Sequence, residues 1–379
     1  MGMEYVPDHP RDTAQSQLER RAKRQKILGL MDVGKSPVLR AFAEFSVARD
    51  ALSKLRRRDG NDDLRAFISD RLLEAGKQPD DWLHYAELFE AEYILATRCD
   101  SENPERQSWL DAAWEAAQRC MEMNPSSACV AEFIRNCRPI EKGFARRVLR
   151  KLELESPLDE YPAVRQYSLA CLYRAINDLH NASKAIEDAY RLCPEDLLIA
   201  SFAKRVRTAI GDYDGALEIL RAQEREISEN AYSEGDPFLA ASQSLHIVEL
   251  CIKAGQRDEA LDRLKRVWSS LSAVDCVEHS PQNHLVNSCA TLLGLLSFSE
   301  GDLSAALHWF RASLLPTSRG LRHKGYDLRL VGRLICIHSA KEACLEYLRL
   351  ATKVGPAKTR REAELFRRIL SDVGDGPAH

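Results

Sequence analysis

The sequence reads NDLHNA at residues 177–182 and GDYDGA at residues 211–216. Each stretch places a turn rich in Asn, Asp or Gly directly before a run of residues with helical spacing. The alanines that end the two stretches, Ala182 and Ala216, lie 34 residues apart. Because one helix–turn–helix unit has this length, the two stretches predict a stack of helical hairpins in which neighbouring units share one core.

The same pattern runs along most of the chain. An alanine stands near the start of the second helix of each predicted hairpin, and in all but the first hairpin a larger apolar residue follows four positions later. These alanines are Ala113, Ala145, Ala182, Ala216, Ala260, Ala306 and Ala343. A small residue is expected where two antiparallel helices cross closely, and the larger residue fills the groove beside the crossing.

The turns inside the hairpins need a residue that tolerates a left-handed backbone. Four of the turns contain such a residue: Asn177, Gly211, Gly255 and Gly301. The two longest gaps between successive alanines, 44 and 46 residues, coincide with the polar stretches 228–237 and 272–283. We interpret these stretches as insertions into loops between hairpins, where extra length costs little.

The predicted organisation is therefore all-α. Residues 1–14, rich in Pro, Asp and His, are expected to be disordered, and residues 15–79 to form an N-terminal helical segment. About seven hairpins occupy residues 80–357. Residues 358–379 are expected to form a capping helix and a tail.

This register resembles the tetratricopeptide repeat. The best copy spans residues 163–196 and carries the following residues at the signature places of that family: Leu169, Ala170, Tyr173, Ala182, Ile186, Ala189 and Pro194. A second copy has Leu293 and Gly294 with Ala306 and Phe310. The resemblance implies a right-handed superhelical solenoid and a non-catalytic scaffold or adaptor, which holds protein partners in a concave groove formed by the first helix of each hairpin.

Five residues at expected outward positions of first helices are the predicted partner-binding residues: Tyr167, Arg174, Ser201, Arg205 and Glu249. A groove of mixed polar and aromatic character suits an extended or helical peptide. The Lys/Asn/Arg clamp with which one subgroup of the family binds acidic chaperone tails is not matched, because Tyr167, Cys171, Ser201 and Arg205 stand at the corresponding positions. No heat-shock chaperone partner is therefore predicted.

Trp82 and Tyr85 resemble the half-a-TPR variant found in RNA-processing factors. An aromatic pair three residues apart is also a common feature of helix cores, and we favour plain packing.

The formal net charge of −3 argues against bulk electrostatic binding to nucleic acid. Basic residues nevertheless gather near the N-terminus, where we read them first as solvated helix faces. They are Arg20, Arg21, Lys23, Arg24, Lys26, Arg56, Arg57 and Arg58. An RNA- or ribonucleoprotein-associated factor that uses these residues is the second hypothesis.

Residues 29–36, GLMDVGKS, satisfy the phosphate-loop spacing G-x-x-x-x-G-K-[ST] through Gly29, Gly34, Lys35 and Ser36. That motif requires a preceding β-strand, whereas residues 15–28 are highly charged and have helical spacing. Nucleotide binding is therefore a third hypothesis, and no cofactor is predicted.

Other reactive residues do not form a recognised site. Cys276, His279 and His284 lie within nine residues in a polar stretch, but their spacing matches no zinc finger, and no metal site is predicted. Cys336 and His338 stand two apart, on different faces of a helix, which does not suit a nucleophile–base pair, and no enzyme is predicted.

The 11 cysteines include no C-x-x-C pair and mostly occupy apolar helical positions. Thiols used in this way indicate a reducing, cytoplasmic compartment. Residues 1–15 lack the apolar stretch of a signal peptide, and no apolar run is long enough for a membrane span.

Overall fold

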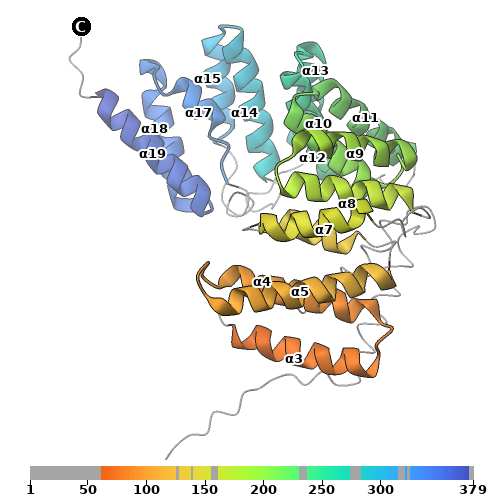
Figure 1. The fold of residues 1–379 in the computed structure, drawn as a ribbon. Coiled ribbons are helices and arrows are strands. Elements are labelled where there is room, and N and C mark those ends of the chain that lie inside the picture. Colours follow the sequence, from red (N-terminus) through yellow and green to blue (C-terminus); the bar gives the residue numbers. More distant parts are fainter. Residues whose placement is uncertain are drawn as a thin grey trace, which may run out of the picture. The chain divides into compact units, whose positions relative to one another are not determined.

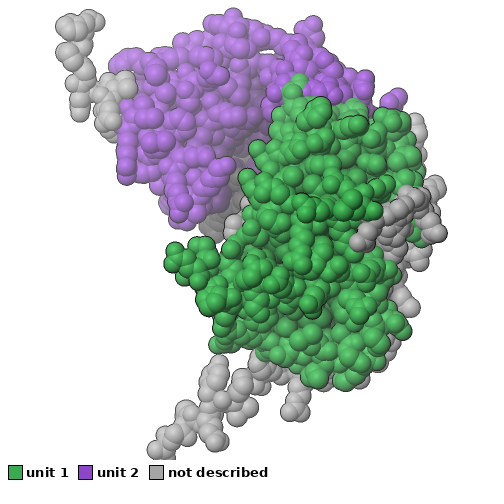
Figure 2. Space-filling view, viewed as in Figure 1, with its two compact units in different colours: residues 1–211 green, residues 212–379 purple. Residues whose placement is uncertain are grey.

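The computed structural model describes residues 61–124, 128–137, 140–154, 161–229, 237–273, 283–314, 321 and 325–374. These residues form helices and turns, with no strand among them, so the all-α prediction is confirmed for the described chain (Figure 1). The chain divides into two compact units, residues 1–211 and residues 212–379 (Figure 2). The finer boundaries expected from the sequence stay predictions.

Unit 1 contains α3 (Asp62–Lys77), α4 (Trp82–Arg98), α5 (Pro104–Met123), α6 (Cys129–Asn136), α7 (Lys142–Leu154), α8 (Pro162–Ala175), α9 (Leu179–Leu192) and α10 (Leu197–Ile210). Helix α4 packs on α5 and α8 on α9 as antiparallel hairpins, and α6 and α7 pack on α8.

Unit 2 contains α11 (Tyr213–Glu229), α12 (Pro237–Lys253), α13 (Arg257–Ala273), α14 (Asn283–Ser299), α15 (Leu303–Ala312), α17 (Arg329–Leu334), a short 3₁₀ helix (His338–Ala340), α18 (Lys341–Val354) and α19 (Ala357–Gly374). Helix α12 pairs with α13, α14 with α15, and α18 with the terminal α19. Successive hairpins are joined by α13 packing on α14 and by α14 packing on α17.

The crossing alanines explain why these helices pack closely. Six of the seven are completely buried, as the spacing predicts: Ala113, Ala145, Ala182, Ala216, Ala260 and Ala306. Ala343 differs, because it is only partly buried while Cys344 and Ala340 take the fully buried positions. The crossing in the last hairpin is therefore displaced from the position that the periodicity predicts.

The predicted left-handed turns are confirmed. The φ angle is 69° at Asn177, 87° at Gly211, 76° at Gly255 and 78° at Gly301. Each turn is followed by a helix that begins within two residues, so the left-handed residue sets where the second helix starts.

Side-chain caps fix several helix starts. Asp178 accepts a hydrogen bond from the backbone N–H of Asn181, and Asp302 from that of Ala305. The Asn103 side chain caps α5 in the same way, with Pro104 at the first helical position. The helix consequently begins at Pro104.

Candidate partner-binding surface

Tyr167 is buried, contrary to the expectation that it faces outward from α8. Its side chain is 1% exposed, its hydroxyl donates to Glu132 Oε1 at 3.3 Å, and its ring meets Phe202 edge-on with centroids 5.8 Å apart. The neighbouring first helices α6 and α10 supply these contacts and close over the ring. Tyr167 therefore supports the surface from below and does not line it.

A buried ion pair lies in the same layer. Arg135 donates to Glu132 at 2.8 Å, and its guanidinium lies over the Phe202 ring at 4.3 Å from the centroid. Burial in this layer raises the pKa of the Tyr167 hydroxyl, and it raises the pKa of the Cys171 thiol to about 12. Both groups are thus neutral at physiological pH, and the layer is a packed polar–aromatic core.

The sequence pattern did not predict this ion pair. Its only local signal is that Glu132 and Arg135 stand three apart on α6, a helix whose described neighbours bury residues 129–135 on all sides.

Exposed and half-exposed cations lie above this layer. Arg174 and Arg205 are exposed, as predicted, and Arg205 Nη2 donates to the hydroxyl of half-buried Ser201 at 3.3 Å. Burial, and after it the neighbouring Arg205, lowers the pKa of Lys204. None of these three cations forms an ion pair with a carboxylate in the described part of unit 1. We name Arg174, Ser201, Lys204 and Arg205 the first-helix surface.

Glu249, the predicted partner-binding residue of unit 2, is engaged inside the protein. Its carboxylate pairs with Arg329 Nη2 at 2.9 Å, and the same guanidinium is held by both oxygens of Asp327. Glu249 therefore already has an ion-pair partner within unit 2.

A closed set of hydrogen bonds holds Asp327 in place. Asn287, 1% exposed, donates to the backbone carbonyl of Ser313 and to the Tyr347 hydroxyl, each at 2.9 Å. The Tyr347 hydroxyl donates to the Asp327 carbonyl at 3.0 Å, and the Asp327 N–H donates back to Asn287 at 2.9 Å. These bonds fix the segment before α17 between α14 and α18.

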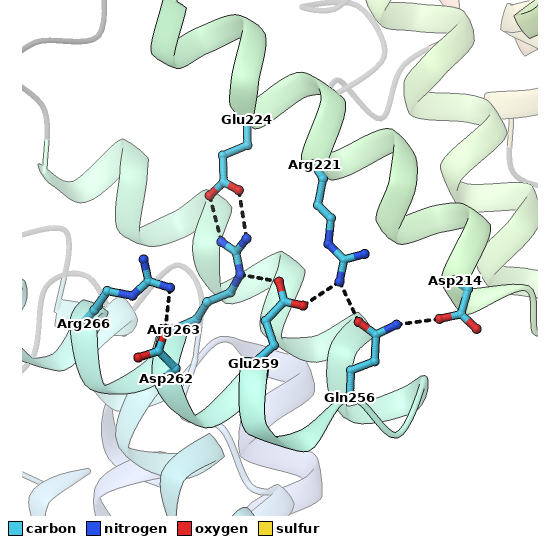
Figure 3. Close-up of polar contacts among 8 residues, drawn as sticks. All are labelled: Asp214, Arg221, Glu224, Gln256, Glu259, Asp262, Arg263 and Arg266. Carbon is cyan, nitrogen blue, oxygen red and sulfur yellow. Dashed lines mark hydrogen bonds and ion pairs between the residues drawn. The ribbon is translucent and has the colours of Figure 1, made fainter.

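A second polar cluster ties α11 to α13 (Figure 3). Arg263 binds both oxygens of Glu224, at 2.8 and 3.0 Å, and reaches Glu259 at 2.9 Å. Arg221 joins Glu259 to Gln256. Burial alone would raise the pKa of Glu259, but the hydrogen bonds from Arg263 and Arg221 outweigh it and lower the pKa. The cluster is an internal brace between successive hairpins.

The remaining predicted residues are placed as follows. The basic residues between Arg20 and Arg58, the Gly29–Ser36 motif, Cys276 and His279 all lie outside the described residues. His284 is half-buried at the start of α14. Within the described ranges no group of His, Cys, Asp and Glu is arranged to hold a metal ion, and no helix has the length and apolarity to cross a membrane.

No protein-family model matches the sequence, and no curated protein matches it. Among solved structures, the chain is similar to a tetratricopeptide repeat protein from Parabacteroides merdae ATCC 43184. That protein is 14% identical, with a TM-score of 0.32, and the match covers 80% of this chain and 94% of that chain. In the present chain, the hairpins have buried alanine crossings and left-handed turns. These features make the described chain a helical-repeat protein of tetratricopeptide-like architecture.

Proposed function

We propose that this chain is a non-catalytic scaffold that binds a protein partner, as a peptide or helix, on the first-helix surface of unit 1. The observation that carries the proposal is the position of Arg174, Lys204 and Arg205, which have no ion-pair partner among the described residues and lie above a fully packed layer. Because the packed layer below is already ordered, a partner that binds has to order the cationic side chains but not the residues beneath them.

The kind of partner follows from the side chains. Arginine presents several N–H donors in a fixed fork, which suits carboxylates and backbone carbonyls of a bound segment. In unit 2 the corresponding acidic residue, Glu249, already has Arg329 as its partner, so the proposal is centred on unit 1.

The test is an affinity purification with the intact chain, with partners quantified by mass spectrometry. We expect Arg174→Glu/Arg205→Glu to lose at least one partner about tenfold, because repulsion replaces charge-assisted hydrogen bonds. The matched control is Lys184→Glu/Lys265→Glu, at exposed positions of the second helices α9 and α13. Circular dichroism establishes that both variants fold. If the two variants retain the same partners, the proposal is wrong.

The RNA-associated and nucleotide-binding hypotheses rest on residues 20–58, outside the described chain, and stay predictions. The cytoplasmic location likewise stays a prediction.

A further inference from the structure

Helix α7 is strongly basic in a chain whose net charge is −3. Its sequence, KGFARRVLRKLEL, contains five cations and one carboxylate. The buried side of the helix is apolar and consists of Phe144, Ala145, Val148, Leu149 and Leu152. Four of the five cations are exposed, and the fifth, Lys151, is half-buried.

Two of the five cations have partners within the protein. Arg147 pairs with Asp111 on α5 at 3.2 Å and lies over the Trp114 ring at 4.3 Å from the centroid. Lys151 pairs with Glu122, also on α5, at 3.8 Å.

The carboxylates at the two ends of α7 are also engaged. Glu141 pairs with Arg106, and Glu153 accepts a hydrogen bond from the Tyr173 hydroxyl at 2.6 Å. Neither carboxylate forms an ion pair with the remaining cations of α7 in the described structure.

Three cations remain: Lys142, Arg146 and Arg150. All are exposed, and none forms an ion pair with any described residue. They stand four residues apart, so they form one ridge along the helix with a rise of about 6 Å at each step. Leu154 continues the ridge by another four residues and is 76% exposed. We name these four residues the cationic ridge.

Like charges four residues apart on a helix repel each other. On the cationic ridge this repulsion acts twice, between Lys142 and Arg146 and between Arg146 and Arg150, and no described carboxylate relieves it. A partner helix with carboxylates at the same spacing would place one acid opposite each cation. A following apolar residue of the partner would then cover Leu154.

We propose that the cationic ridge is a second docking surface, which binds an acidic, helical protein segment with carboxylates four residues apart followed by an apolar residue. This inference rests on the proposed scaffold role but concerns a different helix from the first-helix surface.

Two features favour a protein over a nucleic acid. Proteins that bind single-stranded nucleic acid stack the bases on exposed aromatic rings. At α7, Arg147 covers Trp114, and Phe144 is buried. The exposed Leu154 would also have no apolar counterpart on a phosphate backbone, whereas a protein segment readily provides one.

The experiment measures fluorescence anisotropy of labelled peptides with the full-length chain. The probe is an alanine-based helical peptide with Glu at every fourth position and a Leu four residues after the last Glu. A peptide of the same composition, with its Glu residues spread around the helix, is the reference. We expect the probe to bind more tightly than the reference and to weaken as salt is added, because the contacts are exposed ion pairs.

Lys142→Gln/Arg146→Gln/Arg150→Gln should weaken binding of the probe about tenfold, since each of three exposed pairs contributes a small part. The matched control is Arg360→Gln/Arg361→Gln/Arg368→Gln, which removes the same charge from exposed positions of α19. The ridge variant should melt no lower than the parent, because it removes repulsion. Arg174→Glu/Arg205→Glu should leave binding of the probe unchanged, so the two proposals can fail separately.

A charge swap gives a second test of the same contact. Lys142→Glu/Arg146→Glu/Arg150→Glu should reject the acidic probe and bind its lysine counterpart. The proposal is overturned if both triple Gln variants lose the probe equally, or if the spread-Glu peptide binds as well as the probe. It is also overturned if single-stranded poly-U RNA binds the ridge more tightly than the probe does.

Discussion

Glu92, on α4, offers a quantitative test of how unit 1 is packed. Its side chain lies inside the hairpin, with the residue 5% exposed, and its Oε2 atom has no hydrogen-bond partner among the described residues. Burial, and after it the negative charge of Glu115, raises the pKa of Glu92 from 4.5 to about 8. The folded protein therefore holds a proton on Glu92 at neutral pH.

The size of the effect follows from proton linkage. Between pH 4.5 and pH 8 the unfolded chain has released this proton and the folded chain has not. Stability therefore falls as pH rises through this window, by about 1.4 kcal/mol per pH unit. Over the 3.5 units from 4.5 to 8 the loss attributable to Glu92 approaches about 5 kcal/mol. This value is an upper limit, because water entering the hairpin would reduce it.

The variant Glu92→Gln keeps the size of the side chain and removes its ionisation. The unfolding free energy of the variant minus that of the parent should be larger at pH 8 than at pH 5 by several kcal/mol, as the linkage calculation gives. Urea unfolding followed by circular dichroism at the two pH values measures the difference. Glu342→Gln, at an exposed position of α18, controls for the loss of one charge. A Glu92→Gln difference that is equal at pH 5 and pH 8 would refute the buried, protonated carboxyl.

Three further predictions concern unit 2. A double-mutant cycle with Arg263→Met and Glu224→Gln should give a coupling free energy of about 1 kcal/mol in urea unfolding. Strictly additive effects would contradict the contact between α11 and α13 that Figure 3 shows. Gly294→Ala places a Cβ 2.4 Å from Leu330 Cδ2. It should lower the free energy of unfolding by about 1 kcal/mol, because overpacking exceeds the gain in helix propensity. An unchanged melting temperature would show a loose contact between α14 and α17. Tyr347→Phe removes the hydroxyl that binds Asn287 and the Asp327 carbonyl. The free energy of unfolding, measured by calorimetry, should fall by about 1–3 kcal/mol, because buried polar groups lose a partner. An unchanged value would exclude a stabilising role for that hydroxyl.

The crossings and turns of the hairpins could be predicted from the sequence because their requirements are local. A close helix crossing demands a small residue whatever surrounds it, and a left-handed turn favours Gly or Asn. The exception, Ala343, belongs to the hairpin where α17 is short and a 3₁₀ turn precedes α18, so the helix enters the crossing in a different register.

Exposure on the first helices could not be predicted in the same way. Tyr167 and Arg174 lie seven residues apart on the same side of α8, yet one is buried and the other exposed. Tyr167 is covered by Glu132 of α6 and Phe202 of α10. Nothing local in the sequence of α8 encodes these contacts, because neighbouring helices supply them.

Ion pairs between hairpins do follow a rule that periodicity could have revealed. Arg147 with Asp111, Arg221 with Glu259, and Arg263 with Glu224 are separated by 36, 38 and 39 residues, close to one repeat. Equivalent positions on successive second helices face each other, so opposite charges one repeat apart are expected to meet.

The same rule supports the availability of the cationic ridge. Ala145 and Ala182 set the local repeat at 37 residues, which relates Lys142, Arg146 and Arg150 to Leu179, Ser183 and Glu187 on α9. The first two of these offer no carboxylate. Glu187 has one, but Arg207 binds both of its oxygens, at 2.7 and 2.5 Å. The repeat thus supplies partners for the cations of α11 and α13 and withholds them from the ridge of α7, which leaves the ridge cations open to an acidic partner.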